Sequence, residues 1–498
     1  MPAGGGRSRG LKLAVIGGGS SYTPELVDGV IRRAEELPVR HIALVDIPEG
    51  GEKLDIIAGL TRRMIERAGL DIEVTAGFDR ESAISGADFV ITQFRVGGLA
   101  ARAQDERIPL KYDIIGQETT GPGGFAKALR TVPIALDIAR DMEHLAPDAW
   151  LINFTNPSGI VTEAVTRHSG VRCIGLCNVP ISMQKMIAAG LGVDPRSVKV
   201  EFVGMNHLSW ARRVTVNGVD VTRAVLSHEL VRREFDFQHV AGTAGARSAG
   251  TTGGIGGSGG GRGNDAGGGG DSDSTQGQGQ GQGRGHKAAR DAAHAPGLLD
   301  ALGMIPSYYL RYYYFHDVLV EEEKRQVQEG RGTRADQVMA IEKELFKRFA
   351  DPGLSEKPVE LSQRGGAWYS EAALACISAI YNDRDEVHVL NVPSRGAVSD
   401  LPADAVVEVN CLVNGTGAHP VAQGPLPDSI RGLVQHVKAY ERLTVEAAVK
   451  GDRDIAYLAL LSHPLVPDAY TARSLLEDIL RANAGYLPGF AKASRDTW

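Results

Sequence analysis

A thiol and an imidazole, two side chains that can transfer protons or bind metal ions, lie at the ends of apolar segments. The run RCIGLC ends at Cys177 and is followed by Asn178, and the run EFVGM is followed by Asn206 and His207. Only four cysteines occur in the chain. Taken alone, Cys177 is better interpreted as an inert buried thiol and His207 as a hydrogen-bonded core histidine.

A glycine-rich turn follows the first apolar segment. It consists of Gly17, Gly18, Gly19, Ser20 and Ser21, between LKLAVI and the first helical pattern. Glycines at such a turn let backbone N–H groups approach a pyrophosphate at a helix N-terminus. The match to G-x-G-x-x-G is incomplete, because Tyr22 stands where the third glycine is expected.

Asp46 ends the second apolar segment, where a carboxylate can accept hydrogen bonds from an adenosine ribose. An acid at this place favours NAD over NADP, since it would repel the 2′-phosphate of NADP. The turn and Asp46 together predict an NAD site. The alternative is a tight turn followed by a helix-capping aspartate.

The first 195 residues alternate between apolar segments and amphipathic ones. Strands are expected from Leu11 and at 41–46, 71–77, 88–94, 149–155 and 171–177, and helices at 23–37, 52–69 and 125–144. Thr23 is the expected N-cap of the first helix, and Pro24 suits its first turn. This pattern predicts an α/β fold with a Rossmann-like parallel sheet covered on both faces.

The pattern changes after residue 195. Residues 198–222 favour strands, with a hairpin turn at Asn217–Gly218, and helices then dominate, broken by strands near 386–392 and 405–413. We therefore expect an NAD-binding domain at 11–195 and a mixed α+β domain at 196–498. Residues 1–10 and the glycine-rich stretch 241–296 are expected to be disordered, because almost no apolar side chains could offset the entropy of ordering that stretch.

Length and composition narrow the class of protein. The 498 residues are 43% hydrophobic and carry a formal net charge of −7, and the pI is near 6.0. The acidic balance argues against nucleic-acid or membrane-surface partners. The cysteines are too few for a disulfide framework, MPAGGGRSRG is not an apolar leader, and no apolar run is long enough to span a membrane. We therefore expect a soluble cytoplasmic protein.

Several longer motifs occur in one order along the chain: IGGGSSYTPEL, FRVGG, GQETTGPGG, NFTNPSG, GLCNVP and GMNHLSW. Together they resemble the NAD- and manganese-dependent glycosidases of glycoside hydrolase family 4, closest to the 6-phospho-β-glucosidase branch. The resemblance extends from Leu11 to about Tyr486, apart from the glycine-rich stretch. It implies a second domain like the C-terminal domain of lactate and malate dehydrogenases, and a homodimer or homotetramer.

The resemblance implies a redox mechanism of hydrolysis. NAD⁺ takes hydride from C3 of the sugar, a base removes the proton on C2, the C1 group is eliminated, water adds, and the hydride returns. Cys177 and His207 correspond to the two protein ligands of Mn²⁺, and Tyr309 corresponds to the base. Most tyrosines of the cluster SYYLRYYY must instead serve packing.

The resemblance also implies the substrate contacts. Arg95, Asn156, Asn178 and Arg334 match substrate-binding positions, Arg334 at the phosphate, with Arg364 and Asn391 as weaker candidates. The α branch typically carries aspartate where Asn178 stands, and an amide cannot donate its proton to a leaving group. We expect a β-linked disaccharide 6-phosphate or an aryl 6-phospho-β-glucoside. The alternatives are a 6-phospho-α-glucosidase or α-galacturonidase of the same family, or a hydroxyacid dehydrogenase that consumes NAD⁺.

Overall fold

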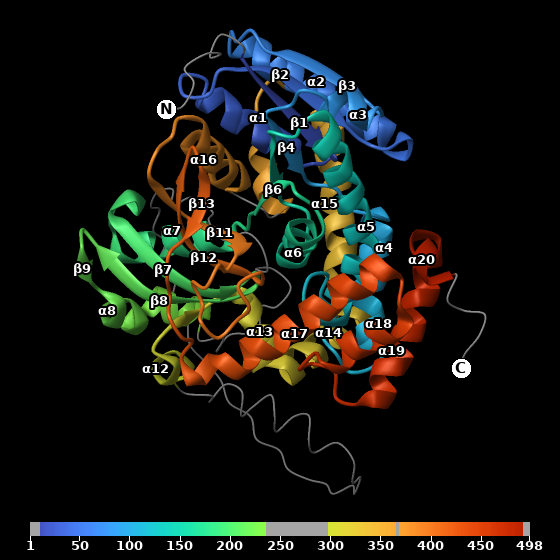
Figure 1. The fold of residues 1–498 in the computed structure, drawn as a ribbon, viewed down its shortest axis with the longest axis vertical. Coiled ribbons are helices and arrows are strands. Elements are labelled where there is room, and N and C mark those ends of the chain that lie inside the picture. The colour runs from blue at the N-terminus through green and yellow to red at the C-terminus, as the bar shows by residue number, and fades with distance from the viewer. Residues whose placement is uncertain (1–9, 236–296, 365–367, 492–498) are drawn as a thin grey trace, which may run out of the picture.

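The computed structural model describes residues 10–235, 297–364 and 368–491 (Figure 1). The N-terminal segment and the glycine-rich stretch for which disorder was predicted lie outside these residues, apart from Gly10. Within the described residues no helix has both the length and the apolar character needed to cross a bilayer.

The N-terminal sheet contains the predicted strands in parallel register. Its strands are β1 Leu11–Ile16, β2 Val39–Val45, β3 Glu73–Gly77, β4 Phe89–Thr92, β5 Trp150–Asn153 and β6 Arg172–Gly175, in the spatial order β3-β2-β1-β4-β5-β6. Side chains alternate between two buried layers: Leu13 and Val15 belong to one core cluster, and Ala14 and Ile16 belong to the other. The strands β1, β4 and β5 are almost wholly apolar because both faces are covered, whereas the edge strand β3 is largely exposed.

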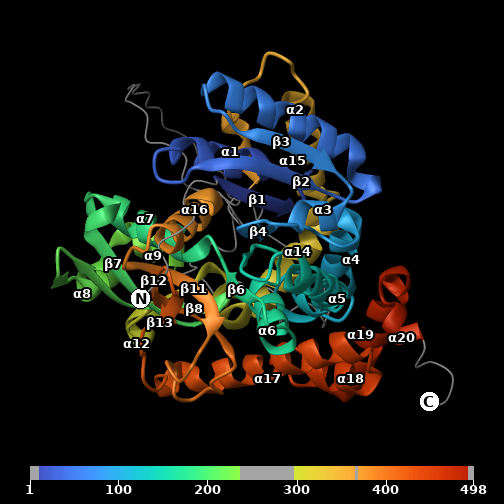
Figure 2. The same cartoon turned by 45° about the horizontal axis from the view of Figure 1, so that its top comes forward.

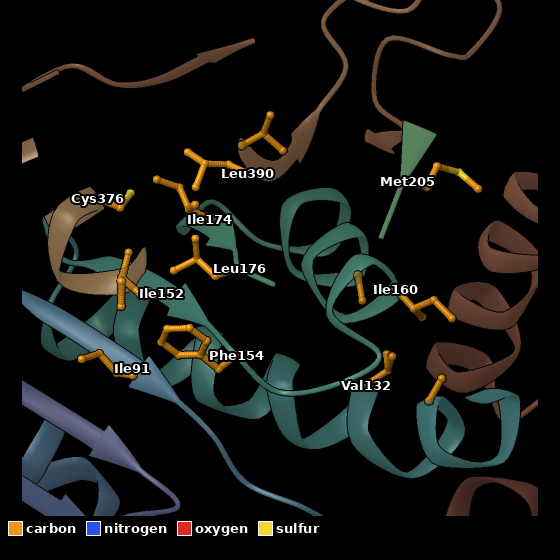
Figure 3. Packing of buried hydrophobic residues seen from close by; sticks show 14 of the residues in the cluster. Ile91, Val132, Ile152, Phe154, Ile160, Ile174, Leu176, Met205, Cys376 and Leu390 are labelled. Carbon is orange, nitrogen blue, oxygen red and sulfur yellow. The ribbon is translucent and has the colours of Figure 1, made fainter. Parts of the chain in front are cut away.

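Helices cover this sheet. The N-terminal helices are α1 Thr23–Arg32, α2 Gly51–Arg67, α3 Arg80–Ile84, α4 Gly98–Leu110, α5 Gly121–Leu145, α6 Ser158–His168 and α7 Val179–Leu191, with 3₁₀ turns at Pro48–Gly50 and Pro195–Ser197. Figure 3 shows Ile91, Ile152 and Ile174 from three neighbouring strands, with Leu390 from the C-terminal half packed nearby. One core cluster therefore includes side chains from both halves of the chain.

The C-terminal half extends the same sheet. Its strands are β7 Val198–Met205, β8 Leu208–Val216, β9 Val219–Asp220, β10 Ile305–Pro306, β11 Glu386–Pro393, β12 Val406–Asn414 and β13 Gly417–Pro420. β11 pairs antiparallel with β6 at Asn391 and Gly175, and β12 and β13 follow, giving nine strands in all. The β7–β8 hairpin forms a second sheet with β9 and β10 and contacts β12.

The remaining helices lie mostly beside and below the sheet (Figure 2). They are α8 Thr222–Ser227, α9 Glu229–Phe235, α12 Leu298–Leu302, α13 Arg311–Tyr314, α14 His316–Gln328, α15 Arg334–Phe349, α16 Tyr369–Tyr381, α17 Asp428–Lys450, α18 Arg453–Leu461, α19 Ala469–Ala482 and α20 Pro488–Ala491, with 3₁₀ turns at Tyr308–Leu310, Val359–Arg364 and Ala484–Tyr486. α17 contacts α5 and α6, and α16 contacts α1. The two halves are thus packed together along several elements.

Local predictions had mixed outcomes. The hairpin turn is confirmed, with Asn217 and Gly218 both at positive φ. The N-cap prediction is wrong, because Tyr22 occupies that position and Thr23 begins the helix, where its hydroxyl donates to the Gly18 carbonyl at 2.8 Å. Pro24 does lie in the first turn.

Helix α4 was not predicted, and α5 begins at Gly121 and not near Phe125. α4 has no apolar stripe because several of its buried residues are charged, including Asp105, whose carboxylate pairs with Arg130 at 2.7 Å. At the start of α5, a side chain at Gly123 would lie 2.2 Å from the Gln117 carbonyl. Only glycine fits so close to the preceding loop.

Candidate active site

A cavity of about 1880 Å³ opens at the carboxyl ends of the parallel strands. Its wall includes Gly17 after β1, Asp46 after β2, Gln93 after β4 and Phe154 after β5. Ligands of open α/β sheets bind at this end of the strands. Of the predicted site residues, the cavity is lined by Gly17, Gly19, Ser20, Asp46, Arg95, Asn156, Asn178, Tyr309, Arg334 and Arg364. Others are buried behind its wall: Gly18, Ser21, Cys177, His207 and Asn391.

The glycine turn is held between two strands. The N–H groups of Gly17 and Gly18 both donate to the Val45 carbonyl at 2.8 Å. Gly17 has φ +88°, and a Cβ there would lie 2.9 Å from the backbone of Phe94. Glycine is required at residue 17 by both conformation and space, as a nucleotide-binding turn demands.

The Asp46 carboxylate accepts two backbone hydrogen bonds, one of them from the glycine turn. Its two oxygens accept from Gly19 N–H and Ile47 N–H, each at 2.9 Å. Burial raises the pKa of Asp46, while these N–H groups and the Lys53 charge oppose the rise. A carboxylate has about four acceptor positions, so it can hold the turn and still accept from a ribose hydroxyl.

Ser21 was predicted to contact the cofactor, but its hydroxyl contacts the C-terminal half of the chain. Its hydroxyl donates to Glu342 of α15 at 3.0 Å, and the same carboxylate pairs with Lys53 at 2.8 Å. Ser21 therefore connects the glycine turn to the C-terminal half.

Three guanidinium groups lie near one another in the cavity wall. Burial lowers the pKa of Arg334, and the charges of Arg102 and Arg364 lower it further. Arg364 is buried, donates to the Tyr22 hydroxyl at 3.1 Å, and lies above the Tyr22 ring. Arg102 pairs with Glu106 and Glu118, and Arg364 lies 3.7 Å from Glu342, whereas Arg334 has no ion pair among the described residues. Because planar guanidinium groups suit phosphate, Arg334 is the best candidate in this wall for binding an anion.

Glu118 is a charged residue of the cavity that the sequence analysis did not single out. It accepts from Arg95, from Lys127 at 2.8 Å and from Arg102 at 2.9 Å. Burial alone would raise the pKa of Glu118, but these cations outweigh it and hold the pKa well below its usual value. The signal for it in the sequence is the polar stretch between glycines in GQETTGPGG.

Cys177 lies in the loop between β6 and α7, with only 5% of its surface exposed. Its sulfur accepts from the Val179 N–H at 3.5 Å. Burial raises the pKa of the thiol, and the nearby Glu408 charge adds to the rise.

His207 lies in the β7–β8 turn at φ +62°, with its ring stacked on Tyr309 at 3.6 Å between centroids. Burial lowers the pKa of His207 to about 3, so its imidazole is neutral and keeps a lone pair for a ligand. Its Nδ1 atom is buried without a hydrogen-bond partner. Burial raises the pKa of Tyr309 well above its usual value, and the Cys177 charge adds to this. The three predicted residues Cys177, His207 and Tyr309 therefore lie together.

This donor set fits a weakly held divalent cation. Cys177 and His207 both lie near Tyr309, and the unpartnered Nδ1 of His207 marks a polar atom that a ligand would satisfy. Among the described residues, no group of three or more His, Cys, Asp and Glu could hold a metal ion. Oxygen ligands would have to come from a bound substrate or from water.

Asn156 and Asn178 complete the predicted set at the cavity. Asn156 follows β5 and is joined to Pro157 by a cis peptide bond. Asn178 is the N-cap residue of α7, next to Cys177. The weaker candidate Asn391 lies in β11 and donates to Glu408 at 3.3 Å, away from the cavity.

The sheet, the glycine turn and the carboxylate after β2 define a Rossmann-type nucleotide-binding fold. The sequence matches the model of the family 4 glycosyl hydrolases over residues 12–193, and that of their C-terminal domain over residues 202–466. The chain belongs to the family 4 glycosyl hydrolases.

Relatives match along almost the whole chain. A probable 6-phospho-beta-glucosidase of Bacillus subtilis (strain 168) is 45% identical, covering 97% of this chain and 98% of the relative. A 6-phospho-beta-glucosidase of Escherichia coli (strain K12) is 39% identical, with the same two shares covered. A structure of the 6-phospho-beta glucosidase of Thermotoga maritima with manganese, NAD+ and glucose-6-phosphate has a TM-score of 0.77 and 34% identity, covering 96% of this chain and 99% of the other.

Proposed function

We propose that this protein is a 6-phospho-β-glucosidase that uses NAD⁺ and Mn²⁺ to cleave β-linked disaccharide 6-phosphates or aryl 6-phospho-β-glucosides. The observation that carries the proposal is one cavity joining the glycine turn, the arginine cluster and Tyr309, beside the Cys177–His207 pair. The names of the relatives above support the reaction and the β configuration.

Different residues of the cavity bind the cofactor and the sugar phosphate. Gly17, Gly19 and Asp46 hold the cofactor at the strand ends, and Arg334 and Arg364 bind the sugar phosphate. Arg95, which is held by Glu118, and Asn156 also line the cavity and bind the sugar. When bound, the cofactors supply a reversible hydride acceptor for C3 of the sugar and a positive charge, held by Cys177 and His207, that acidifies C2–H.

Tyr309 is the base that removes the proton on C2. Its ring stacks on that of His207, one of the two expected metal ligands, and it lines the cavity. The C1 group then leaves by elimination and takes a proton from solvent, water adds at C1, and Tyr309 returns a proton to C2. C3 finally recovers its hydride, so hydrolysis involves no net oxidation. Asn178 has no proton to give the leaving group, which favours β-glucosides over the α substrates of the related branch.

The test is hydrolysis of 4-nitrophenyl β-glucoside 6-phosphate in D₂O, with and without NAD⁺, Mn²⁺ and reductant. We expect turnover only with both cofactors, catalytic amounts of NAD⁺, and deuterium at C2 of the released glucose 6-phosphate. Tyr309→Phe should lower the rate by about 10²- to 10⁴-fold. Tyr308→Phe, the same change at the neighbouring residue, is the matched control and should keep the rate.

Three results would contradict this assignment. Product without C2 deuterium excludes removal of the C2 proton. A fast Tyr309→Phe variant excludes this tyrosine. NADH accumulating in step with turnover would instead support a dehydrogenase. Cytoplasmic location and a dimeric or tetrameric assembly stay predictions.

A further inference from the structure

We infer that Glu408 is the positioning residue that fixes the geometry of both Cys177 and His207. This inference rests on the proposed metal site and adds to it a residue from a third part of the chain. Glu408 lies in β12, only 1% exposed, and does not line the cavity. It can therefore act on the reaction only through its neighbours.

The two oxygens of Glu408 hold the two sides of the turn that carries His207. Oε1 accepts from the Asn206 amide at 3.2 Å, and Oε2 accepts from the Ser209 hydroxyl at 2.7 Å. His207 lies between these donors in the left-handed region, at φ +62°. That conformation is costly for a residue other than glycine and persists only where neighbouring contacts enforce it. Glu408 supplies such contacts from both sides.

Glu408 also reaches Cys177 by two routes. The Asn206 side chain, which donates to Glu408, also interacts with the Cys177 thiol. Asn391 donates to Glu408 at 3.3 Å and is paired in register with both Glu408 and Gly175, two residues before Cys177. One carboxylate therefore connects the β6 end and the β7–β8 turn, the two segments that must keep a fixed separation to bind one ion.

Stability alone does not account for this carboxylate. Its hydrogen-bond donors are the neutral side chains of Asn206, Ser209 and Asn391, and no ion pair of the described residues involves it. Burying a carboxylate without a counter-charge disfavours folding. Partners of this kind that orient metal ligands typically change metal affinity by about 10- to 100-fold when they are removed.

The experiment is a titration of the full chain with Mn²⁺, without NAD⁺ or sugar, following free Mn²⁺ by electron paramagnetic resonance. Glu408→Leu removes both acceptor oxygens at similar size, and we expect Mn²⁺ to bind about 10- to 100-fold more weakly. Glu36→Leu is the control, because Glu36 also accepts from a serine hydroxyl, that of Ser378 at 2.8 Å, but its other partners are Arg33 and Arg384 and not the segments that carry Cys177 and His207. It should bind Mn²⁺ like the wild type.

Co²⁺ provides a readout of geometry besides affinity. Its thiolate charge-transfer absorption reports the bond to Cys177, and we expect this band to weaken or shift in Glu408→Leu but not in Glu36→Leu. If Glu408→Leu does not fold, Ser209→Ala carries the test, since it removes one of the two contacts. Weaker Mn²⁺ binding by Ser209→Ala supports the inference.

The experiment distinguishes failure of the inference about Glu408 from failure of the proposed metal site. Wild-type Mn²⁺ affinity in folded Glu408→Leu, or in Ser209→Ala where that variant replaces it, overturns the role of Glu408. If Cys177→Ser also binds Mn²⁺ like the wild type, the proposed metal site is wrong, and the inference about Glu408 is lost with it.

Discussion

His463 should make the folded protein sensitive to mild acid. It is 1% exposed, in the loop after α18, and packs against the Tyr313 and Tyr440 rings. Its Nδ1 accepts from the Leu465 N–H at 3.1 Å, and its Nε2 faces the Tyr313 hydroxyl at 3.5 Å. The backbone N–H at Nδ1 requires the neutral ring. Burial lowers the pKa of His463 to about 3, and His436 and His316 add to the shift.

The sign of the effect follows from proton binding. Below the unfolded pKa of 6.5 the unfolded chain binds a proton at this residue that the folded chain does not bind until the pH approaches 3. The contribution of neutral His463 to stability is therefore complete above pH 6.5 and is lost as the pH falls from there towards 3. Between pH 7 and pH 5 the loss is about 2 kcal/mol, from 1.36 kcal/mol per pH unit below the unfolded pKa.

Urea unfolding at pH 7 and pH 5 measures this loss. His463→Gln keeps an acceptor for Leu465 N–H but cannot bind a proton in this range, so its stability should fall by about 2 kcal/mol less than that of the wild type. His144→Gln, at an exposed histidine of α5, is the control and should follow the wild type. Equal losses in the wild type and His463→Gln would refute the reasoning.

Two further variants test the cavity. Gly17→Ala should abolish measurable NAD⁺ binding by calorimetry, because its Cβ would lie 2.9 Å from the Phe94 backbone; Gly69→Ala, also at positive φ but with nothing within 4 Å, should bind NAD⁺ normally. Arg334→Gln should raise KM for the phosphorylated substrate about 10- to 100-fold, since a hydrogen bond to a charged group contributes about 1.5–3 kcal/mol. Unchanged KM would remove Arg334 from the phosphate site.

The sequence predicted the parallel strands because burial on both faces leaves a continuous apolar signal, as in LKLAVI. It did not predict α4, whose buried side chains are charged and paired with distant partners, such as Asp105 with Arg130. No local pattern reports such a pairing. Tyr22 and Thr23 show the same limit at a helix start, where the hydroxyl of Thr23 bonds back into the glycine turn.

For the site, residue types and positions predicted the glycine turn and Asp46, the family resemblance supplied the other residues, and the structure supplied their contacts. Asp46, Ser21 and Asn391 each have partners that no motif specified: the glycine turn, α15 and Glu408. Glu408 did leave a trace, because VVEVNCLV places a carboxylate inside an otherwise apolar strand. A charge at a buried strand position requires partners, and these came from a hairpin about 200 residues earlier in the chain.

The pairing of β6 with β11 explains why the candidate metal site depends on both halves. β6 would be the edge of a six-stranded parallel sheet, and an uncovered edge exposes unpaired backbone groups. β11 covers it through Asn391 and Gly175, two residues before Cys177. The same C-terminal strands bring Glu408 to the turn that carries His207. Covering the sheet edge and fixing the two ligands are therefore accomplished by the same strands, so the cofactor-binding half alone cannot set the separation of Cys177 and His207.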